Sequence, residues 1–142
     1  MSSQNQQASK QASIQGKQTE NCILLIDDEL VIREIGSEML ESLGFICISA
    51  ENGEEGIQLY HQNKDKIALV ILDIEMPGIS GDQVYRILKD ADPSLKILLI
   101  SGYAKGYLEA KYFKTKINSF MFMSKPFQLS QLSQKINSLM GG

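Results

Sequence analysis

The sequence lacks the features of a membrane protein and of a nucleic-acid-binding protein. Its longest apolar runs, such as Ile97 to Ile100, fall far short of the roughly 20 residues that a membrane span needs. Positive charge is not in excess: 14 Lys and Arg face 17 Asp and Glu, a net charge of −3. This balance does not favour nonspecific attraction to nucleic acid or to anionic membranes. Residues 1–20 also lack the apolar core of a secretory signal, so we expect a cytoplasmic protein.

Histidine and cysteine are both scarce. The single histidine, His61, lies in a polar stretch without a nearby serine, cysteine or second histidine to make it a catalytic base or a metal ligand. Cys22 and Cys47 lie inside apolar segments and lack the second pair that a metal site would need. We interpret both as free thiols that fill the core, in preference to a disulfide or a redox site.

The first twenty residues differ in composition from the rest of the chain. Residues 1–20 contain six Gln, four Ser and few apolar side chains. Such a segment buries too little apolar surface to offset the entropy of ordering it, so we predict a disordered tail or linker. Residues 21–142 are enough for one domain, and no DNA-binding or enzymatic output domain is expected in this chain.

From Cys22 onward, short apolar runs alternate with segments of helical periodicity. The apolar runs predict strands at residues 22–26, 45–50, 68–72, 96–100 and 119–123. The periodic segments predict one helix ended by Gly44, one opened by Asn52, and others at residues 80–91, 103–116 and about 129–139. Strands that alternate with helices predict an α/β fold, a parallel sheet with right-handed crossovers and helices on both faces.

The helical stripes also predict which side chains face the core. The first helix has apolar residues at spacings of three and four, namely Ile32, Ile35, Met39 and Leu43. The helices at 80–91 and 129–139 are expected to bury two further sets: Val84, Ile87, Leu88 and Ala91, and then Leu129, Leu132, Ile136 and Leu139.

Polar residues follow the apolar strands at the ends where a parallel sheet binds ligands. Asp27 and Asp28 follow the first strand, Asp73 the third, Ser101 the fourth and Lys125 the fifth. In open parallel sheets, ligands bind at the carboxyl ends of the strands, beside a reversal of strand order. We therefore expect three carboxylates, a hydroxyl and an ammonium group to converge on one rim of the sheet.

Three crowded carboxylates need a cation among them. Each pair repels by about 4 kcal/mol at a separation of roughly 4 Å and an effective dielectric of about 20. An acidic, partly hydrated pocket suits Mg²⁺, and Lys125 supplies a second cation. Together they can neutralise the oxygens of a transferring phosphoryl group, to which Ser101 can donate a hydrogen bond. Asp73 is the candidate nucleophile, because the first strand already supplies an adjacent pair suited to the metal.

These residues resemble the receiver domain of two-component response regulators. The resemblance covers Cys22 to about Met140 and depends on four motifs: Leu25-Ile26-Asp27-Asp28-Glu29, Asp73-Ile74-Glu75-Met76-Pro77-Gly78-Ile79-Ser80-Gly81, Ser101-Gly102 and Lys125-Pro126-Phe127. It implies a flavodoxin-like fold with strand order 2-1-3-4-5. It also implies that Asp73 accepts phosphate from a kinase phosphohistidine, so that the partner is a histidine kinase or a histidine phosphotransfer domain. The chain would then be a switch that assists its own phosphoryl transfer and dephosphorylation, and not a stand-alone enzyme.

The resemblance also implies roles for individual residues. Asp28 and Asp73 would bind Mg²⁺ directly with the backbone carbonyl of Glu75, while Asp27 would hold metal-bound water. Glu75 and Tyr103, each two residues past a site residue, occupy positions that tune phosphate lifetime in the family.

A buried aromatic residue would complete the switch. Phe122, three residues before Lys125, matches the aromatic that turns inward when the hydroxyl of Ser101 contacts the phosphate. The family often has Tyr at this position. Because Phe122 lacks the phenolic hydroxyl, the switch in this chain would work by packing, without a hydrogen bond from this residue. It would alter the surface around the fourth helix, the fifth strand and the last helix. Dimerisation through that surface is not expected, since the last helix has only Lys135 as a charge.

Three alternatives share part of this pattern. A flavin-binding module of similar fold would need a Ser/Thr/Gly phosphate loop where this chain has Asp27-Asp28-Glu29. A haloacid-dehalogenase phosphatase needs a second Asp two residues after its nucleophile, where Glu75 stands. A degenerate receiver, which binds partners without phosphorylation, is disfavoured because no acidic, hydroxyl or lysine position is missing.

The setting of the domain has two interpretations. It is either a stand-alone regulator or phosphorelay carrier, or the C-terminal receiver of a hybrid sensor histidine kinase. The stretch Leu99-Ile100-Ser101-Gly102-Tyr103 and the Gln-rich leader favour the second interpretation. The lysines that follow the fourth strand form either a solvated helix face or a docking patch for an acidic partner: Lys105, Lys111, Lys114 and Lys116.

Removing residues 1–20 should leave the stability of the domain nearly unchanged, because this segment has almost no apolar side chains to bury. In a thermal denaturation experiment, a chain that begins at Asn21 should melt within a few degrees of the full-length chain. A much lower melting temperature would show that the segment packs on the domain, contrary to the prediction.

Overall fold

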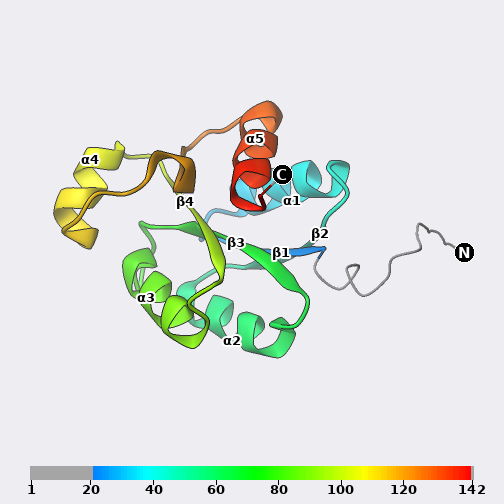
Figure 1. The fold of residues 1–142 in the computed structure, drawn as a ribbon, viewed down its shortest axis with the longest axis horizontal. Helices are drawn as coiled ribbons and strands as arrows, with labels where there is room; N and C mark the ends of the chain where they lie inside the picture. Colours follow the sequence, from blue (N-terminus) through cyan, green and yellow to red (C-terminus); the bar gives the residue numbers. More distant parts are fainter. Residues whose placement is uncertain (1–20, 142) are drawn as a thin grey trace, which may run out of the picture.

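The computed structural model describes residues 21–141, which form a parallel sheet between two layers of helices (Figure 1). The strand order is β2-β1-β3-β4-β5, as predicted. The strands are β1 (Cys22–Ile26), β2 (Ile46–Ala50), β3 (Ile67–Asp73), β4 (Lys96–Ser101) and β5 (Phe122–Ser124). The predicted flavodoxin-like fold is therefore confirmed, while the expected tail at residues 1–20 lies outside the described residues.

Helices cover both faces of the sheet. In Figure 1, α1 (Leu30–Ser42) and α5 (Leu129–Leu139) lie on one face, and α2 (Gly53–Asn63) and α3 (Gly81–Ala91) on the other. The short α4 (Lys105–Leu108) lies beyond α3 at one end of the molecule. Among residues 21–141, no helix has both the length and the apolarity that a membrane crossing requires.

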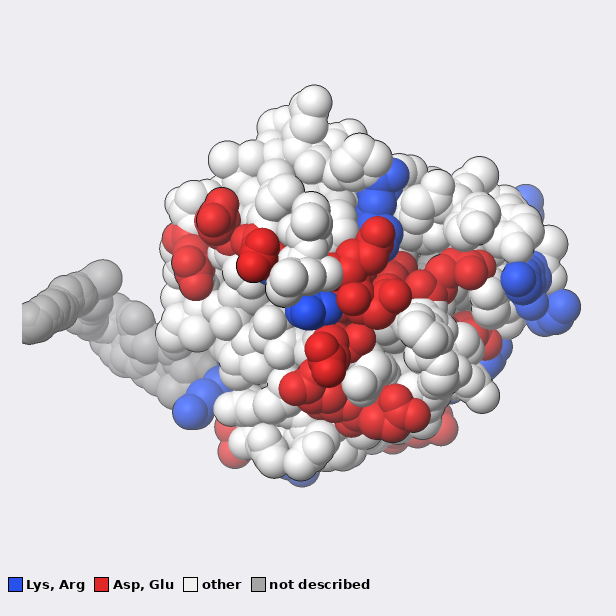
Figure 2. Space-filling model, turned by 180° about the vertical axis from the view of Figure 1, so that it is seen from behind, with Lys and Arg blue, Asp and Glu red and all other residues white. Residues whose placement is uncertain are grey.

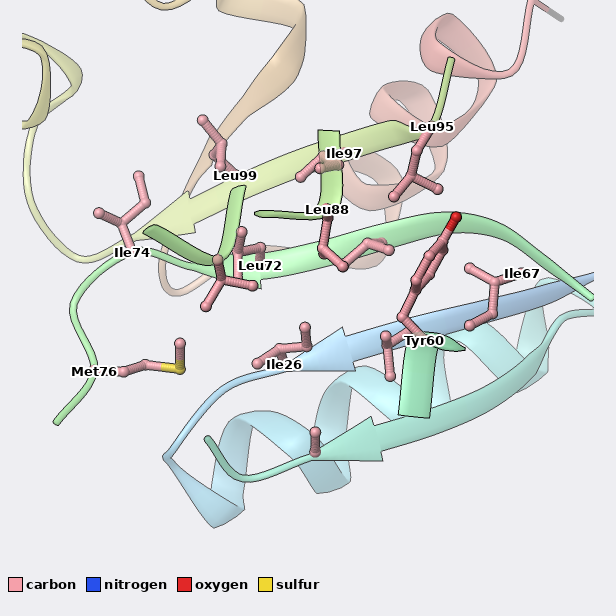
Figure 3. Close-up of a cluster of buried hydrophobic side chains, with 14 of the residues drawn as sticks. Ile26, Tyr60, Ile67, Leu72, Ile74, Met76, Leu88, Leu95, Ile97 and Leu99 are labelled. Atoms are coloured by element: carbon pink, nitrogen blue, oxygen red, sulfur yellow. The ribbon is translucent and has the colours of Figure 1, made fainter. Parts of the chain in front are cut away.

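The sheet separates two apolar clusters. Alternate residues of β1 point to opposite faces, so Leu24 and Ile26 pack on the side of α2 and α3, while Ile23 and Leu25 pack on the side of α1 and α5. Figure 3 shows the first cluster, in which Tyr60 of α2 lies among the strand and helix side chains. Strands that are buried on both faces explain why the sequence has continuous apolar runs.

The predicted inward stripe of α1 is wrong at Ile35, whose side chain is 46% exposed. The buried positions are Gly36 and Leu40, and a Cβ atom at Gly36 would lie only 2.8 Å from Leu25 Cδ2. The helix thus approaches β1 most closely at a glycine. The other three residues of the predicted stripe do pack against the core: Ile32, Met39 and Leu43. The pattern failed only at Ile35, because the buried neighbour Gly36 has no apolar side chain to detect.

The structure corrects three further core predictions. Ile87 is 40% exposed and Ala91 is exposed, because α3 turns Val84 and Leu88 toward the sheet. Leu129 is 42% exposed, although the rest of the α5 stripe begins as predicted with the buried Leu132. Ala91 and Leu129 are terminal residues of their helices, where the periodic pattern continues but packing partners are fewer.

The segment after β4 differs most from the prediction. The expected helix at 103–116 is shorter: α4 ends at Leu108, a π-helical turn follows at Glu109–Phe113, and Lys114 has a left-handed backbone with φ 61°. The start of the predicted strand at 119–123 is a 3-10 turn, Ser119–Met121, and β5 begins at Phe122. These irregular turns lack the hydrophobic period of either α-helix or strand, so the pattern could not predict them.

Both cysteines are free thiols, as predicted. Cys22 is buried, and Cys47 is half-buried with its Sγ 3.3 Å from the hydroxyl of Ser37. Cys22 belongs to one apolar cluster, and Cys47 packs against the other.

Replacing Leu40 with alanine should lower the free energy of unfolding by about 2–5 kcal/mol, because its fully buried side chain would leave a cavity. Ile35→Ala, on the same helix, should cost less than about 1 kcal/mol, since Ile35 is largely solvent-exposed. Urea denaturation of both variants measures the difference. Equal losses would contradict the observed orientation of α1.

Candidate functional site

The carboxyl ends of the strands bring the predicted polar residues onto one rim. Asp27, Asp28 and Asp73 each place a carboxylate oxygen within 4.8 Å of the others. The ammonium group of Lys125 lies 3.0 Å from Asp27 Oδ2 and 3.4 Å from Asp73 Oδ2. The expected convergence of the three carboxylates and the ammonium group is therefore observed.

Backbone hydrogen bonds fix these residues at or just past the ends of the regular strands. Asp27 N donates to Ala50 O at 3.1 Å, and Lys125 N donates to Ser101 O at 2.8 Å. Asp73 is paired with Ile100 as the last residue of β3. The sheet ladder, and not a flexible loop, thus sets the distance between the charged groups.

Asp27 is a buried carboxylate held by its own loop. Its side chain is fully buried, and Oδ1 accepts a hydrogen bond from Glu29 N at 2.8 Å. Burial raises the pKa of Asp27 above its usual value, although the Glu29 amide and Lys125 oppose that rise. Arg33 of α1 also donates to Asp27 O at 2.8 Å, which ties the loop to the helix.

Asp73 is the most strongly perturbed acid of the site. It is 2% exposed, and burial together with the nearby charge of Asp27 raises its pKa to about 8, against the opposing effect of Lys125. Burial disfavours the charged carboxylate, and the negative charge of Asp27 adds to that cost beyond what Lys125 offsets. The site would therefore gain from an additional cation.

Lys125 joins three acids. Besides Asp27 and Asp73, its ammonium group donates to Glu29 Oε1 at 2.7 Å. Burial alone would lower the pKa of Lys125, but the hydrogen bond to Glu29 and the charges of Asp73 and Asp27 raise it. The contact with Glu29 was not predicted, although its place in the acidic run Asp27-Asp28-Glu29 was an available signal.

The donor set fits a hard divalent cation. Three carboxylates within mutual reach of one ion face a single ammonium group, and all the candidate ligand atoms are oxygens. Such oxygen sites suit Mg²⁺, which takes few carboxylates and keeps several waters. Acidic side chains also gather in a band across the face seen in Figure 2, so the surrounding surface adds further negative charge.

A glycine allows the β3–α3 connection to fold tightly against the site. A Cβ atom at Gly81 would lie 2.4 Å from Asp73 O and 2.4 Å from Ile74 Cα, which no real side chain tolerates. Gly81 N also donates to Ile74 O at 2.9 Å. This close approach fixes the loop that includes Glu75.

The site opens to solvent through a hollow of about 290 Å³, called the site hollow below. Its lining comprises acids, one lysine and the start of the segment after β4: Asp28, Glu29, Asp73, Glu75, Gly102, Tyr103 and Lys125. Tyr103 is 53% exposed, and its ring lies 5.0 Å from that of Tyr107. The two predicted lifetime-tuning residues, Glu75 and Tyr103, thus both border the site hollow.

Glu75 has a hydrogen-bond partner that the sequence pattern does not predict. The hydroxyl of Tyr112, in the π-helical turn, donates to Glu75 Oε2 at 2.6 Å. The hydrogen bond to Glu75 raises the pKa of the Tyr112 hydroxyl, which is therefore a donor at neutral pH. No local sequence signal connects the two residues, which are 37 positions apart.

Ser101 and Phe122 lie beside the rim without lining the site hollow. Ser101 is fully buried, and its Oγ accepts a hydrogen bond from Tyr103 N at 3.0 Å. Phe122 is 8% exposed and belongs to the same apolar cluster as its pairing partner Leu99 and Leu108 of α4. Phe122 also lines a second hollow, of about 370 Å³, between the α4 segment and α5.

Comparisons with known proteins identify relatives of this chain. The chain is 28% identical to the sensor kinase CckA of Brucella abortus over 83% of this chain and 12% of the kinase. It is 31% identical to the probable transcriptional regulator ycf27 of Guillardia theta over 87% of this chain and 46% of the regulator. The chain therefore spans less than half the length of these curated relatives.

A solved structure gives a closer match in length. The response regulator protein TrrA of Thermotoga maritima, in complex with Mg²⁺-BeF, is 34% identical with a TM-score of 0.71, over 84% of this chain and 98% of that protein. The family model described as the response regulator receiver domain matches residues 23–137. The chain therefore belongs to the response regulator receiver domain family.

Proposed function

We propose that Asp73 is the phosphoryl acceptor of this receiver domain. The position of Asp73 at the site hollow supports this proposal. Asp27 and Asp73 are both buried carboxylates, but of these two only Asp73 lines the hollow. Asp27 is also engaged by the Glu29 amide. Asp73 is therefore the buried acid that an incoming phosphoryl group can reach.

The phosphoryl donor would be a phosphohistidine of a histidine kinase or a histidine phosphotransfer domain. A carboxylate oxygen of Asp73 attacks phosphorus, the phosphorus–nitrogen bond breaks, and the imidazole leaves with the bonding electron pair and takes a proton from water. The product is an acyl phosphate on Asp73. This is a single transfer onto the chain itself and its later hydrolysis, so the domain acts as a switch and not as a stand-alone enzyme.

Mg²⁺ would be held by Asp28, Asp73 and the backbone carbonyl of Glu75, with Asp27 accepting hydrogen bonds from metal-bound water. When bound, the ion supplies positive charge next to the transferred phosphoryl group. Lys125 needs little movement to assist, since its ammonium group already lies 3.4 Å from Asp73 Oδ2 and can turn to a phosphoryl oxygen.

Ser101 and Phe122 would transmit the change. The hydroxyl of Ser101 accepts a bond from Tyr103 N, so its proton is free to be donated to a phosphoryl oxygen. Movement of the β4 end would alter the space beside Phe122, at the hollow between the α4 segment and α5. Phosphorylation would thereby bias the packing of that surface.

The setting of the domain in its pathway is a further part of the proposal. The match to a small part of the CckA kinase supports the C-terminal receiver of a hybrid sensor histidine kinase. A stand-alone phosphorelay protein remains the alternative.

Dimerisation through α4, β5 and α5 is not proposed, because Lys135 is the only charged residue of α5.

Asp73→Asn should abolish phosphorylation by acetyl phosphate in the presence of Mg²⁺, because the acceptor carboxylate is removed. A chelator should abolish labelling of the wild type, since the acidic cluster then lacks its cation. Asp92→Asn is a matched control: Asp92 accepts from Tyr60 and lies away from the site hollow, so its loss should leave labelling unchanged. Intact-protein mass spectrometry measures the added phosphoryl group. Equal labelling of wild type and Asp73→Asn would refute the proposal.

Asp73→Asn should also stabilise the metal-free domain at alkaline pH. The folded-state pKa of Asp73 is raised from 3.8 to about 8, so protonation favours the folded state, and this stability is lost as the pH rises between these values. With a chelator present, the wild type should lose a few degrees more of melting temperature than Asp73→Asn between about pH 5 and about pH 8. If the melting temperatures of the two proteins changed with pH in parallel, the raised pKa of the buried Asp73 carboxyl group would be contradicted.

A further inference from the structure

The Tyr112–Glu75 hydrogen bond connects two parts of the molecule that the receiver mechanism treats separately. Glu75 belongs to the β3–α3 loop and lines the site hollow beside Asp73. Tyr112 belongs to the π-helical turn after α4, and its hydroxyl lies 2.6 Å from Glu75 Oε2. The contact therefore extends from the mouth of the site hollow to the segment that follows α4.

Tyr112 is held in place by several groups besides Glu75. Its backbone oxygen accepts a hydrogen bond from Arg86 Nη2 at 3.2 Å, and Arg86 in turn pairs with Asp82 at 2.8 Å. The ammonium group of Lys111 lies 5.1 Å from the centre of the Tyr112 ring. A tyrosine restrained at its backbone and its ring can hold its hydroxyl in a fixed place.

The π-helical turn itself determines the direction of Tyr112. Lys114 N donates to Glu109 O at 2.7 Å, five residues back, so this turn contains one residue more than an α-helical turn. The next residue, Phe113, packs edge-on against Tyr85 of α3 with ring centres 5.7 Å apart. A regular α-helix would rotate Tyr112 about the helix axis relative to α4, away from its present direction.

The position of the Glu75 carboxylate matters because of charge. A phosphoryl group on Asp73 carries close to two negative charges at neutral pH, in a hollow that already contains Asp28 and Glu29. A free glutamate in the same lining would add like charge next to the phosphoryl oxygens. A carboxylate that accepts the Tyr112 hydroxyl is instead directed toward the π-helical turn.

We infer that Tyr112 is a positioning residue, which holds the Glu75 carboxylate away from the phosphoryl group and so favours the phosphorylated state. This inference rests on the proposed function, in which Asp73 is the acceptor. The Tyr112 hydroxyl donates to the side chain of Glu75 and not to Asp28 or Asp73, so Tyr112 acts only through the Glu75 carboxylate. The π-helical turn would then influence the phosphorylation site through Tyr112 and the Glu75 carboxylate.

The test uses beryllofluoride as the probe, at saturating Mg²⁺, with binding measured by tyrosine fluorescence or by chemical shifts. Tyr112→Phe should bind beryllofluoride about two- to fivefold more weakly than the wild type, the size expected for one partly screened like-charge contact. Glu75→Gln should bind at least as tightly as the wild type, because it removes the charge. In the Glu75→Gln background, Tyr112→Phe should have no further effect.

Tyr107→Phe is the matched control, since the Tyr107 hydroxyl contacts Lys111 and not Glu75. It should bind as the wild type does. Unchanged or tighter binding by Tyr112→Phe, or the same loss in the Glu75→Gln background, would overturn the inference. Failure of the wild type itself to bind beryllofluoride would instead count against the proposed function, so the two failures are distinguishable.

Discussion

Two carboxylates are buried side by side at one rim of the sheet, and one ammonium group is shared between them. Asp27 and Asp73 are 0% and 2% exposed, and Lys125 lies within 3.4 Å of both. Burial of charge is unfavourable unless opposite charge compensates it, and here the raised pKa values of both acids indicate that compensation is incomplete. Folding, protonation and cation binding are therefore linked through the same three side chains.

The backbone prevents the two acids from moving apart. β1 and β3 are adjacent strands in the middle of the sheet, paired from Cys22 to Ile26 against Ile67 to Leu72. Gly81 packs directly against the backbone of Asp73 from the other side. Because the strands are held at ladder spacing, repulsion cannot be relieved by a loop movement. It can be relieved only by a proton, an ion or a change at Lys125, which are the events expected of a phosphorylation site.

The sequence predicted the parts of the site that depend on strand ends. Asp27, Asp73 and Lys125 directly follow or end apolar runs, and parallel strands bring such positions to one rim whatever the details of packing. The core stripe of α1 was predicted less well, because the closest approach to the sheet occurs at Gly36, which has no side chain for a hydrophobic pattern to detect. Periodicity alone therefore placed Ile35 inside.

Contacts made by irregular segments could not be predicted. The hydrogen bond between Tyr112 and Glu75 depends on a π-helical turn. The sequence of this turn, including its left-handed end at Lys114, has no pattern that distinguishes the turn from a weak α-helix. The same is true of the Lys125–Glu29 contact, which requires knowledge of side-chain directions across two loops. Tertiary geometry supplies both.

The shortness of β5 has a consequence for how the molecule opens. β5 pairs with β4 over only three residue pairs, whereas β1, β3 and β4 share longer ladders. Local unfolding proceeds through the elements with the fewest hydrogen bonds and buried contacts, so the edge that precedes Lys125 is the part of the sheet that opens at the lowest free energy. Amide hydrogens of Phe122 to Ser124 would then exchange with solvent before those of the central strands. In such an opened form the two buried acids lose their ammonium partner while the rest of the sheet stays folded.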